Sequence, residues 1–337
     1  MYADFRVEAT RGDLVESVHR ISLAVVDDTG RLVAAAGNPD LQTFWRSAAK
    51  PFQVMPVLAD GAADRAGFTP AEVALACASH SSEPVHVATA QGMLAKLALP
   101  ERALACGPHV PLSPVVAERV LREHVTMTPA WSNCSGKHAG MLALALAHGW
   151  PLEGYERLEH PVQQRILAEI CRWSDLRPDQ LGLGVDGCTA VSVALPLRAM
   201  ALAYARFGVS DEPAAVRLRE AVTAHPAMLA GEGRLCSDLL AAAGPRIFAK
   251  VGADGVYSAA IPGARLGLAL KVEDGEMRSA APALMALLLW LGRTVDLGFD
   301  PAALPGTVLR HATLPLLNTQ GAETGTLRAA GAPHFLA

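Results

Sequence analysis

The sequence predicts an α/β fold of the α+β kind, in which strands from both ends of the chain form one antiparallel sheet around a helical middle region. β-prone runs bounded by turn residues occur only near the two ends, and Asp-Gly and Pro-Gly pairs between them are typical of hairpins. Strands from both ends must meet in one sheet if the terminal segments are to share a core. The predicted strands are residues 18–26, 31–36, 246–251, 255–261 and 265–272.

Helices are predicted for most of the region between these strands. The first begins near Ser47 and is broken or kinked near Pro56, and an apolar helix at residues 283–291 should cover one face of the sheet. We expect one catalytic unit over residues 1–337, with a sheet subregion at about 5–60 and 245–325 and a helical subregion at about 61–244. The other predicted helices cover residues 84–98, 113–123, 136–147, 161–173, 190–206 and 213–223.

Composition and charge exclude several classes of protein. Of the 337 residues, 51% are hydrophobic and 18% are charged, which is typical of a compact folded protein. The net charge of −4 and the absence of basic clusters argue against nucleic acid as a partner. The longest apolar run is about half a membrane span, and the N-terminal segment lacks the apolar core of a secretory signal. We therefore expect no membrane partner, a cytoplasmic location and six thiols: Cys77, Cys106, Cys134, Cys171, Cys188 and Cys236.

The segment Arg46-Ser47-Ala48-Ala49-Lys50-Pro51 places a hydroxyl and an amine on one face of the first helix, because residues three apart share a face. Pro51 is tolerated only in the first turn, so the helix must begin close to Ser47. Backbone N–H groups there favour developing negative charge. A buried lysine of lowered pKa could take the serine proton. An ordinary helix start would give the same pattern.

Further polar clusters interrupt apolar segments of the chain. Residues 77–83 (CASHSSE) are dense in hydroxyls and titratable groups, although a serine-rich helix cap would look the same. Residues 133–138 (NCSGKH) precede an apolar helix, and residues 184–189 (GVDGCT) form a loop in which two glycines permit close backbone approach. Lys250-Val251-Gly252 lies on a predicted strand and is similar to the Lys-Thr-Gly motif of Ser-Lys acyl enzymes.

These clusters fall in the order found in penicillin-recognising serine enzymes. The strings RSAAKP, CASHSSEP, SNCSGKHAGML, GVDGCTA, AGEGR and KVGADGVY, in this order, also resemble the bacterial L-asparaginase II family of the rhizobial kind. The resemblance runs from about Arg11 to Gly325. It implies a fold related to the serine β-lactamases, penicillin-binding proteins and serine glutaminases, and hydrolysis of L-asparagine to L-aspartate and ammonia.

The resemblance also implies two serine–lysine pairs and a metal site. Ser47 with Lys50 and Ser79 with Lys250 would be the catalytic pairs. Ser47 is the first choice of nucleophile, because a helix start offers an oxyanion hole, and Ser79 is the competitor. A zinc ion, one per chain, would be bound by three residues and a water. The alternative is two buried thiols beside a structural lysine; the three residues are Cys134, Lys137 and Cys188.

Free asparagine carries a carboxylate and an ammonium, so its site needs a fixed cation and a fixed anion. Arg46 and Arg234 are candidates for the carboxylate, since a guanidinium can bind it bidentately. Asp186 and Glu232 are candidates for the ammonium. A histidine in the motifs could relay protons, although a hydrogen-bonded core histidine is the alternative. The candidate substrate-binding residues are therefore Arg46, His80, Asp186, Glu232 and Arg234, with His138 as a second candidate relay.

Other functions stay open at this point. A different Ser-Lys acyl hydrolase is one alternative, either a glutaminase or an enzyme like a β-lactamase or peptidase. Val251 removes the hydroxyl that β-lactam enzymes use, which weakens the β-lactamase alternative. A non-catalytic relative that binds an amino acid or zinc is another. Glutamine differs from asparagine by one methylene, which the sequence cannot resolve. A homodimer is the default oligomeric state.

Overall fold

Strands from the two ends of the chain pair in one antiparallel sheet, as predicted. The computed structural model describes residues 4–336, and within them this sheet has nine strands. They are β1 (Phe5–Arg11), β2 (Leu14–Asp27), β3 (Leu32–Ala36), β7 (Phe248–Gly252), β8 (Val256–Ile261), β9 (Leu266–Val272), β10 (Thr313–Leu317), β11 (Glu323–Gly331) and β12 (His334–Phe335). The order is β10-β11-β1-β2-β9-β8-β7, with β3 pairing both β2 and β12.

The long strand β2 joins the two ends of the chain. Its first half pairs with β1, while its second half lies between β3 and β9, with Leu23 opposite both Ala36 and Leu270. The hairpin predicted at residues 18–36 is confirmed. In its turn the Asp27 carboxylate accepts hydrogen bonds from the backbone N–H groups of Thr29 and Arg31, each at 3.0 Å. Strands β1, β10, β11 and β12 were not predicted.

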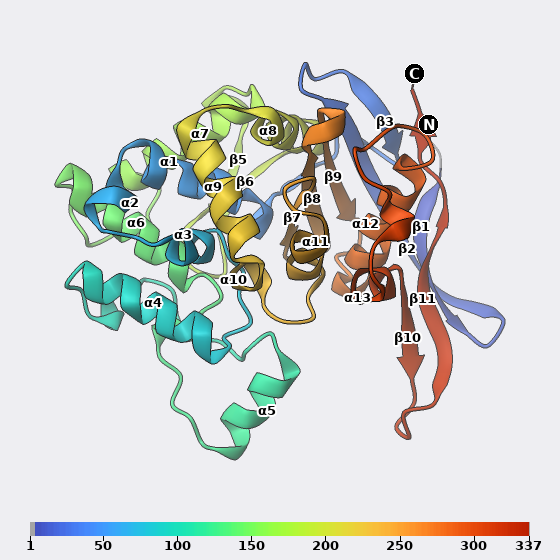
Figure 1. The fold of residues 1–337 in the computed structure, drawn as a ribbon, viewed down its shortest axis with the longest axis horizontal. Helices are drawn as coiled ribbons and strands as arrows, with labels where there is room; N and C mark the ends of the chain where they lie inside the picture. Colours follow the sequence, from blue (N-terminus) through green and yellow to red (C-terminus); the bar gives the residue numbers. More distant parts are fainter. Residues whose placement is uncertain (1–3, 337) are drawn as a thin grey trace.

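Helices cover both faces of the central strands. Every residue of β8 and β9 is buried, as expected for strands between two layers. Figure 1 shows α8 (Leu197–Val209) and α12 (Met277–Leu291) on opposite sides of these strands. Gly267 allows close packing, because a Cβ there would lie 2.0 Å from the Ala201 carbonyl oxygen of α8. The prediction that the apolar helix near the C-terminus covers one face is confirmed.

The middle region is mostly helical, as predicted. Residues 190–206 are not one helix, because a strand occupies the first part and pairs in a small antiparallel sheet of order β4-β6-β5. Its strands are β4 (Gln42–Phe44), β5 (Gly182–Val185) and β6 (Val191–Pro196). The helices of this region are α1 (Lys50–Ala59), α2 (Ala62–Arg65), α3 (Pro70–Ala76), α4 (Pro84–Lys96), α5 (Pro114–Arg122), α6 (Ser135–His148), α7 (Pro161–Ser174), α8, α9 (Pro213–Ala224), α10 (Pro226–Ala230) and α11 (Leu235–Ala243).

Two local features bear on the expectations. Helix α1 continues through Pro56 to Ala59, so of the expected break or kink near Pro56 the break does not occur. A further short helix, α13 (Gly306–Leu309), follows α12. Helix α5 stands at the lower edge of the molecule in Figure 1, away from the other helices. In residues 4–336, the structure contains no helix that is both long and apolar enough to cross a membrane.

Candidate active site

Ser79 lies between the amines of two buried lysines. Its Oγ accepts hydrogen bonds from Lys250 Nζ at 2.8 Å and from Lys50 Nζ at 3.1 Å. Lys50 begins α1, Lys250 lies in the middle of β7, and Ser79 follows α3, so three distant segments meet at one oxygen. The two lysines are only 1% and 0% exposed, and Ser79 is 4% exposed. This convergence places one hydroxyl between two amines that are shielded from water.

The partner of Lys50 differs from the sequence-based expectation. We expected its amine to bind Ser47 three residues earlier. In the structure Lys50 instead donates to Ser79, to the Ala78 carbonyl and to the Asn133 carbonyl at 3.3 Å. Ser47 lies in a 3-10 turn, Arg46–Ala49, and α1 starts only at Lys50. The long lysine side chain therefore extends into the interior, while half-buried Ser47 lies beside two cavities.

The turn that carries Ser47 is held firmly against the sheet. Trp45 is fully buried, and its Nε1 donates to Ser258 Oγ of β8 at 3.0 Å. Tyr204 of α8 donates to the Ala48 carbonyl at 2.7 Å. At Gly252, which ends β7, a Cβ would lie 2.8 Å from the Trp45 carbonyl oxygen, so only glycine permits this approach. The close contact fixes the Ser47 turn beside the strand that carries Lys250.

Burial sets the proton affinity of Lys250. Removal from water and, to a smaller extent, repulsion by the nearby Lys50 together lower the pKa of this amine to about 7. Its hydrogen-bond acceptors are the Ser79 hydroxyl and the Val251 carbonyl at 2.9 Å, both of them neutral. A lysine in this state can accept a proton near neutral pH, which an ordinary lysine cannot do.

A second cluster, which we call the thiol cluster, consists of Cys134, Lys137 and Cys188. Cys134 precedes α6 and Lys137 lies in its first turn, while Cys188 comes from the loop between β5 and β6. Lys137 Nζ lies 3.1 Å from Cys188 Sγ, and all three residues are at most 8% exposed. Interaction with the neighbouring Cys134 lowers the pKa of Cys188, and Lys137 shifts it in the same direction. Burial alone would lower the pKa of Lys137, but the neighbouring Cys188 and Cys134 raise it.

The donors of the thiol cluster fit a zinc ion. Two sulfur ligands from separate segments suit zinc, and an amine nitrogen can complete a set of three that leaves one position open. Lys137 would have to lose its proton on binding, as metal ligands generally do. Within residues 4–336, no three His, Cys, Asp or Glu side chains are grouped to hold a metal, so the lysine is needed for a third ligand.

Gly136 allows the helix that carries the thiol cluster to pack closely against the helix that precedes Ser79. Gly136 lies in the first turn of α6, between Cys134 and Lys137 in the sequence. A Cβ at this position would lie 2.3 Å from the carbonyl oxygen of Leu75 in α3, the helix that leads to Ser79. The backbones of α6 and α3 are therefore in direct contact. This contact sets the spacing between the thiol cluster and the serine loop.

Two cavities meet at Ser47. The first, the thiol-side cavity, has a volume of about 330 Å³ and is lined by Cys134, Cys188, Asp186, Arg46, His109 and Gly107, among others. The second, the lysine-side cavity, has a volume of about 360 Å³ and is lined by Ser79, Arg234, Gly252, Asp254 and Met277, among others. Both are lined by Ser47, Leu112, Asn133 and Ala253. Ser47 and Ser79 thus share one cavity, as the proposed chemistry requires.

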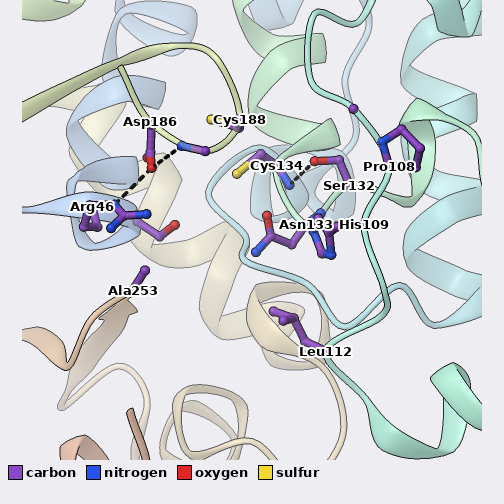
Figure 2. Close-up of a pocket in the computed structure, with 13 residues that line it drawn as sticks. Arg46, Pro108, His109, Leu112, Ser132, Asn133, Cys134, Asp186, Cys188 and Ala253 are labelled. Carbon is purple, nitrogen blue, oxygen red and sulfur yellow. Dashed lines mark hydrogen bonds and ion pairs between the residues drawn. The ribbon is translucent and has the colours of Figure 1, made fainter. Parts of the chain in front are cut away.

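Arg46 holds two loops together at the edge of the thiol-side cavity. Figure 2 shows its guanidinium pointing toward Asp186, whose Oδ1 accepts from Nε at 3.0 Å. Its Nη1 donates to Asp254 in the turn after β7. The Arg46 backbone has a φ of 51°, a left-handed conformation that is costly for a residue with a side chain. Arg46 therefore ties the Ser47 turn to the Cys188 loop and to the β7–β8 turn.

Arg234 is the better placed cation for a substrate carboxylate. It lies in the lysine-side cavity and donates to the Ser79 carbonyl at 2.6 Å, to the Ala230 carbonyl at 3.2 Å and to Ser81 Oγ at 3.4 Å. No acidic side chain in residues 4–336 forms an ion pair with it, whereas Arg46 has two acidic partners. A guanidinium that already has its carboxylates neutralises a third one less well than one that has none.

Two predicted substrate-binding residues lie away from the cavities. His80 is fully buried, and its Nε2 pairs with Ser135 Oγ at 2.9 Å while its Nδ1 accepts from the Ser82 N–H at 3.1 Å. Glu232 is exposed on its loop and lines neither cavity. His80 is therefore a hydrogen-bonded core histidine, which was the alternative to a proton relay.

His138 is also buried, and its Nδ1 pairs with the Tyr155 hydroxyl at 2.7 Å, but its Nε2 has no hydrogen-bond partner among the described residues. The sequence reasoning, in turn, did not select His109 and Asp254. His109 Nε2 accepts a hydrogen bond from the Asn133 N–H at 2.9 Å, and it lies on the cavity wall opposite Asp186 in Figure 2. Asp254 lay in the quoted string KVGADGVY, which was the one signal available.

Comparison with known proteins gives one family over nearly the whole chain. The model of L-asparaginase II matches residues 7–329. No curated protein matches the chain. Among solved structures, Mglu in its native form is 19% identical, with a TM-score of 0.35, over 82% of this chain and 65% of that chain. Mglu in its glutamate form is also 19% identical, with a TM-score of 0.32, over 78% and 58%. The chain thus spans less than two thirds of the length of these Mglu chains.

Proposed function

The chain belongs to the L-asparaginase II family, whose members are amidohydrolases, and from this premise we propose that it hydrolyses L-asparagine to L-aspartate and ammonia. The observation that carries the proposal is the position of Ser79 Oγ, within 3.1 Å of two buried lysine amines in a cavity that Ser47 also lines. An amide needs a nucleophile, a proton acceptor and a proton donor, and this arrangement supplies all three.

Ser47 is the proposed nucleophile. It is the more accessible of the two serines and lies where the cavities meet, whereas Ser79 is 4% exposed and its oxygen is engaged by both lysines. Ser47 Oγ would bond to the amide carbon, and its proton would pass into the chain Lys50–Ser79–Lys250. No hydrogen bond joins Ser47 and Lys50 in this structure, but catalytic hydrogen bonds often tighten only when substrate is bound.

Ser79 is the proposed proton relay. Because its hydroxyl is hydrogen bonded to both lysines, it can pass a proton from either amine toward the departing nitrogen. Ammonia leaves as the carbon–nitrogen bond breaks, and a serine ester remains. Water then attacks the ester carbon, gives up its proton to the same chain and releases aspartate. Lys250, with its pKa near 7, is the group that can gain and lose the proton.

Substrate orientation follows from charge. The α-carboxylate would bind Arg234 in the lysine-side cavity, and the α-ammonium, which is attached to the same carbon atom, would bind Asp254 on the lining of that cavity, because Asp186 lines only the thiol-side cavity. Cys134, Lys137 and Cys188 would hold a zinc ion, which as a Lewis acid would stabilise negative charge that develops near Ser47. The homodimer and the cytoplasmic location stay predictions.

The test separates the two serines and the competing substrates. Ammonia release from asparagine should exceed release from glutamine, with no hydrolysis of a chromogenic β-lactam. Ser47→Ala should lower kcat/KM at least about a thousandfold. Ser79→Ala should lower it by about a hundredfold or more. Ser174→Ala, at a buried serine of α7, serves as the control and should retain activity.

Mass spectrometry of trapped protein decides which serine is acylated. An aspartyl ester on Ser47 in the Ser79→Ala protein is the expected result. An ester on Ser79 would reverse the assignment of the two roles. Thermal stabilisation by asparagine without any ammonia release would show a binding protein and not an enzyme. A preference for glutamine would move the substrate to the longer amide.

A further inference from the structure

The site is larger than its proposed substrate needs. The lysine-side cavity of about 360 Å³ is already in the size range of cavities that hold drug-sized ligands, which are larger than asparagine. It contains both Ser79 and Arg234, so it can hold the whole aspartyl part of the molecule. The thiol-side cavity adds about 330 Å³ on the other side of Ser47. The leaving group of asparagine is ammonia, which fills almost none of that volume.

The direction of the leaving group follows from the two cavities. With the α-carboxylate at Arg234, the reacting carbonyl lies at Ser47, where the cavities meet. The aspartyl carbon chain then lies on the lysine side of that carbonyl. The carbonyl oxygen and the amide nitrogen are the other two substituents of the carbonyl carbon, so both face away from the aspartyl chain, and a group carried by the nitrogen extends toward the thiol-side cavity. A group attached to this nitrogen would therefore enter a space that is already open.

One wall of the thiol-side cavity suits an alkyl group. Pro108 and Leu112 are apolar, and Figure 2 shows them on the side away from Arg46 and Asp186. Leu112 is 44% exposed, so an alkyl group that covered it would remove apolar surface from water. Gly107 widens this wall, because a Cβ built there would meet nothing within 4 Å.

We propose that the protein also hydrolyses secondary amides of L-aspartate, in which the side-chain amide nitrogen carries a short alkyl group that occupies the thiol-side cavity. This inference rests on the proposed function and extends its substrate class. The same bonds change as with asparagine. Ser47 Oγ bonds to the carbonyl carbon, the carbon–nitrogen bond breaks, and the alkylamine leaves with the proton delivered through Ser79. Water then cleaves the ester, so one amide and one water give aspartate and one amine.

The experiment compares asparagine with its side-chain N-ethyl derivative. The wild-type protein should release ammonia from the first and ethylamine from the second. Gly107→Leu should fill the cavity wall and lower kcat/KM for the ethyl amide at least about tenfold, while kcat/KM for asparagine changes less than about threefold. Gly306→Leu is the matched control, because Gly306 also has nothing within 4 Å of its Cβ position and lies outside both cavities.

A second variant covers the case in which Gly107→Leu does not fold. Leu112→Ala changes an exposed residue and removes the apolar wall, so it should lower the ethyl-amide to asparagine ratio of kcat/KM severalfold. Wild-type hydrolysis of asparagine without hydrolysis of the ethyl amide would overturn this inference and leave the proposed function intact. A ratio that neither variant changes would overturn it as well. Hydrolysis of neither compound would overturn both proposals.

Discussion

Lys250 and Lys137 are equally buried, yet their pKa values move in opposite directions. Lys250 is 0% exposed and Lys137 is 3% exposed. The amine of Lys250 faces a hydroxyl, a carbonyl and a second lysine, so burial lowers its pKa to about 7. The amine of Lys137 faces Cys188 Sγ, and Cys188 and Cys134 raise its pKa in spite of the burial. For Lys250 burial lowers the pKa and the charge of Lys50 adds to this effect, whereas for Lys137 the two nearby cysteines outweigh burial.

This difference divides the site into two regions with separate tasks. The lysine side contains a base that is neutral near neutral pH, so it can move protons. The thiol side contains two buried sulfur atoms beside an amine, which is the set of donors proposed to hold a zinc ion. Because Gly136 keeps the two regions in backbone contact, neither can be displaced without moving the other. Variants of the lysine side and of the thiol side show whether each region keeps its function while the other region is intact.

Removal of the Lys250 amine should have the largest effect. Lys250→Met keeps the length and the burial of the side chain but removes the base, so kcat/KM for asparagine should fall by about a hundred- to ten-thousandfold. The control is Lys271→Met on β9, where a buried amine bonds only the Val272 carbonyl outside both cavities. That variant should retain activity. Near-normal turnover of Lys250→Met would remove the lysine from the proton chain.

Removal of both thiols should abolish the metal site and leave the proton chain in place. The double variant Cys134→Ser and Cys188→Ser should bind zinc at least about a hundredfold more weakly than the wild type. Elemental analysis of protein purified without added metal measures the zinc content directly. Cys171→Ser, at a half-buried thiol of α7, is the control and should keep the wild-type content. Equal zinc in all three proteins would refute the site, and a zinc-free wild type with full activity would remove the metal from the reaction.

The pH dependence should report on the lysine side alone. Lys250 is a base when it has lost its proton, and its lowered pKa of about 7 means that the neutral form is gained as the pH rises through 7. The kcat/KM for asparagine should therefore increase across this range, with a value about tenfold lower at pH 6 than on the plateau. The measurement is initial ammonia release between pH 5.5 and about 9. A flat profile would show that another group accepts the proton.

The fold was largely predictable because its main signals are local. The hairpin at residues 18–36 and the C-terminal strands carry turn residues between β-prone runs, and both features act over a few residues. The segment at residues 190–206 was misassigned, because a short apolar run does not distinguish a buried strand from a helix. Strand β11 was not predicted either. Its partner β1 is more than 300 residues away, and no local sequence pattern indicates a pair so far apart.

The site was predictable as a set of residue types but not as a set of partners. The strings that contain Ser47, Lys50, Ser79 and Lys250 are unusual enough to be noticed in the sequence. That Lys50 reaches Ser79 instead of Ser47 depends on where α1 begins and on which way a long side chain turns. Glu232 and His80 were selected by residue type and proximity to motifs, which do not determine whether a side chain faces a cavity.

The contact at Gly136 has a consequence for any attempt to alter substrate preference. A methyl group there would collide with the Leu75 carbonyl oxygen, so random libraries that include this codon would mostly return inactive clones. The wall formed by residues 107–112 lies in a loop, outside every helix and strand, and tolerates change far better. Directed evolution should therefore vary the loop and leave the glycine fixed.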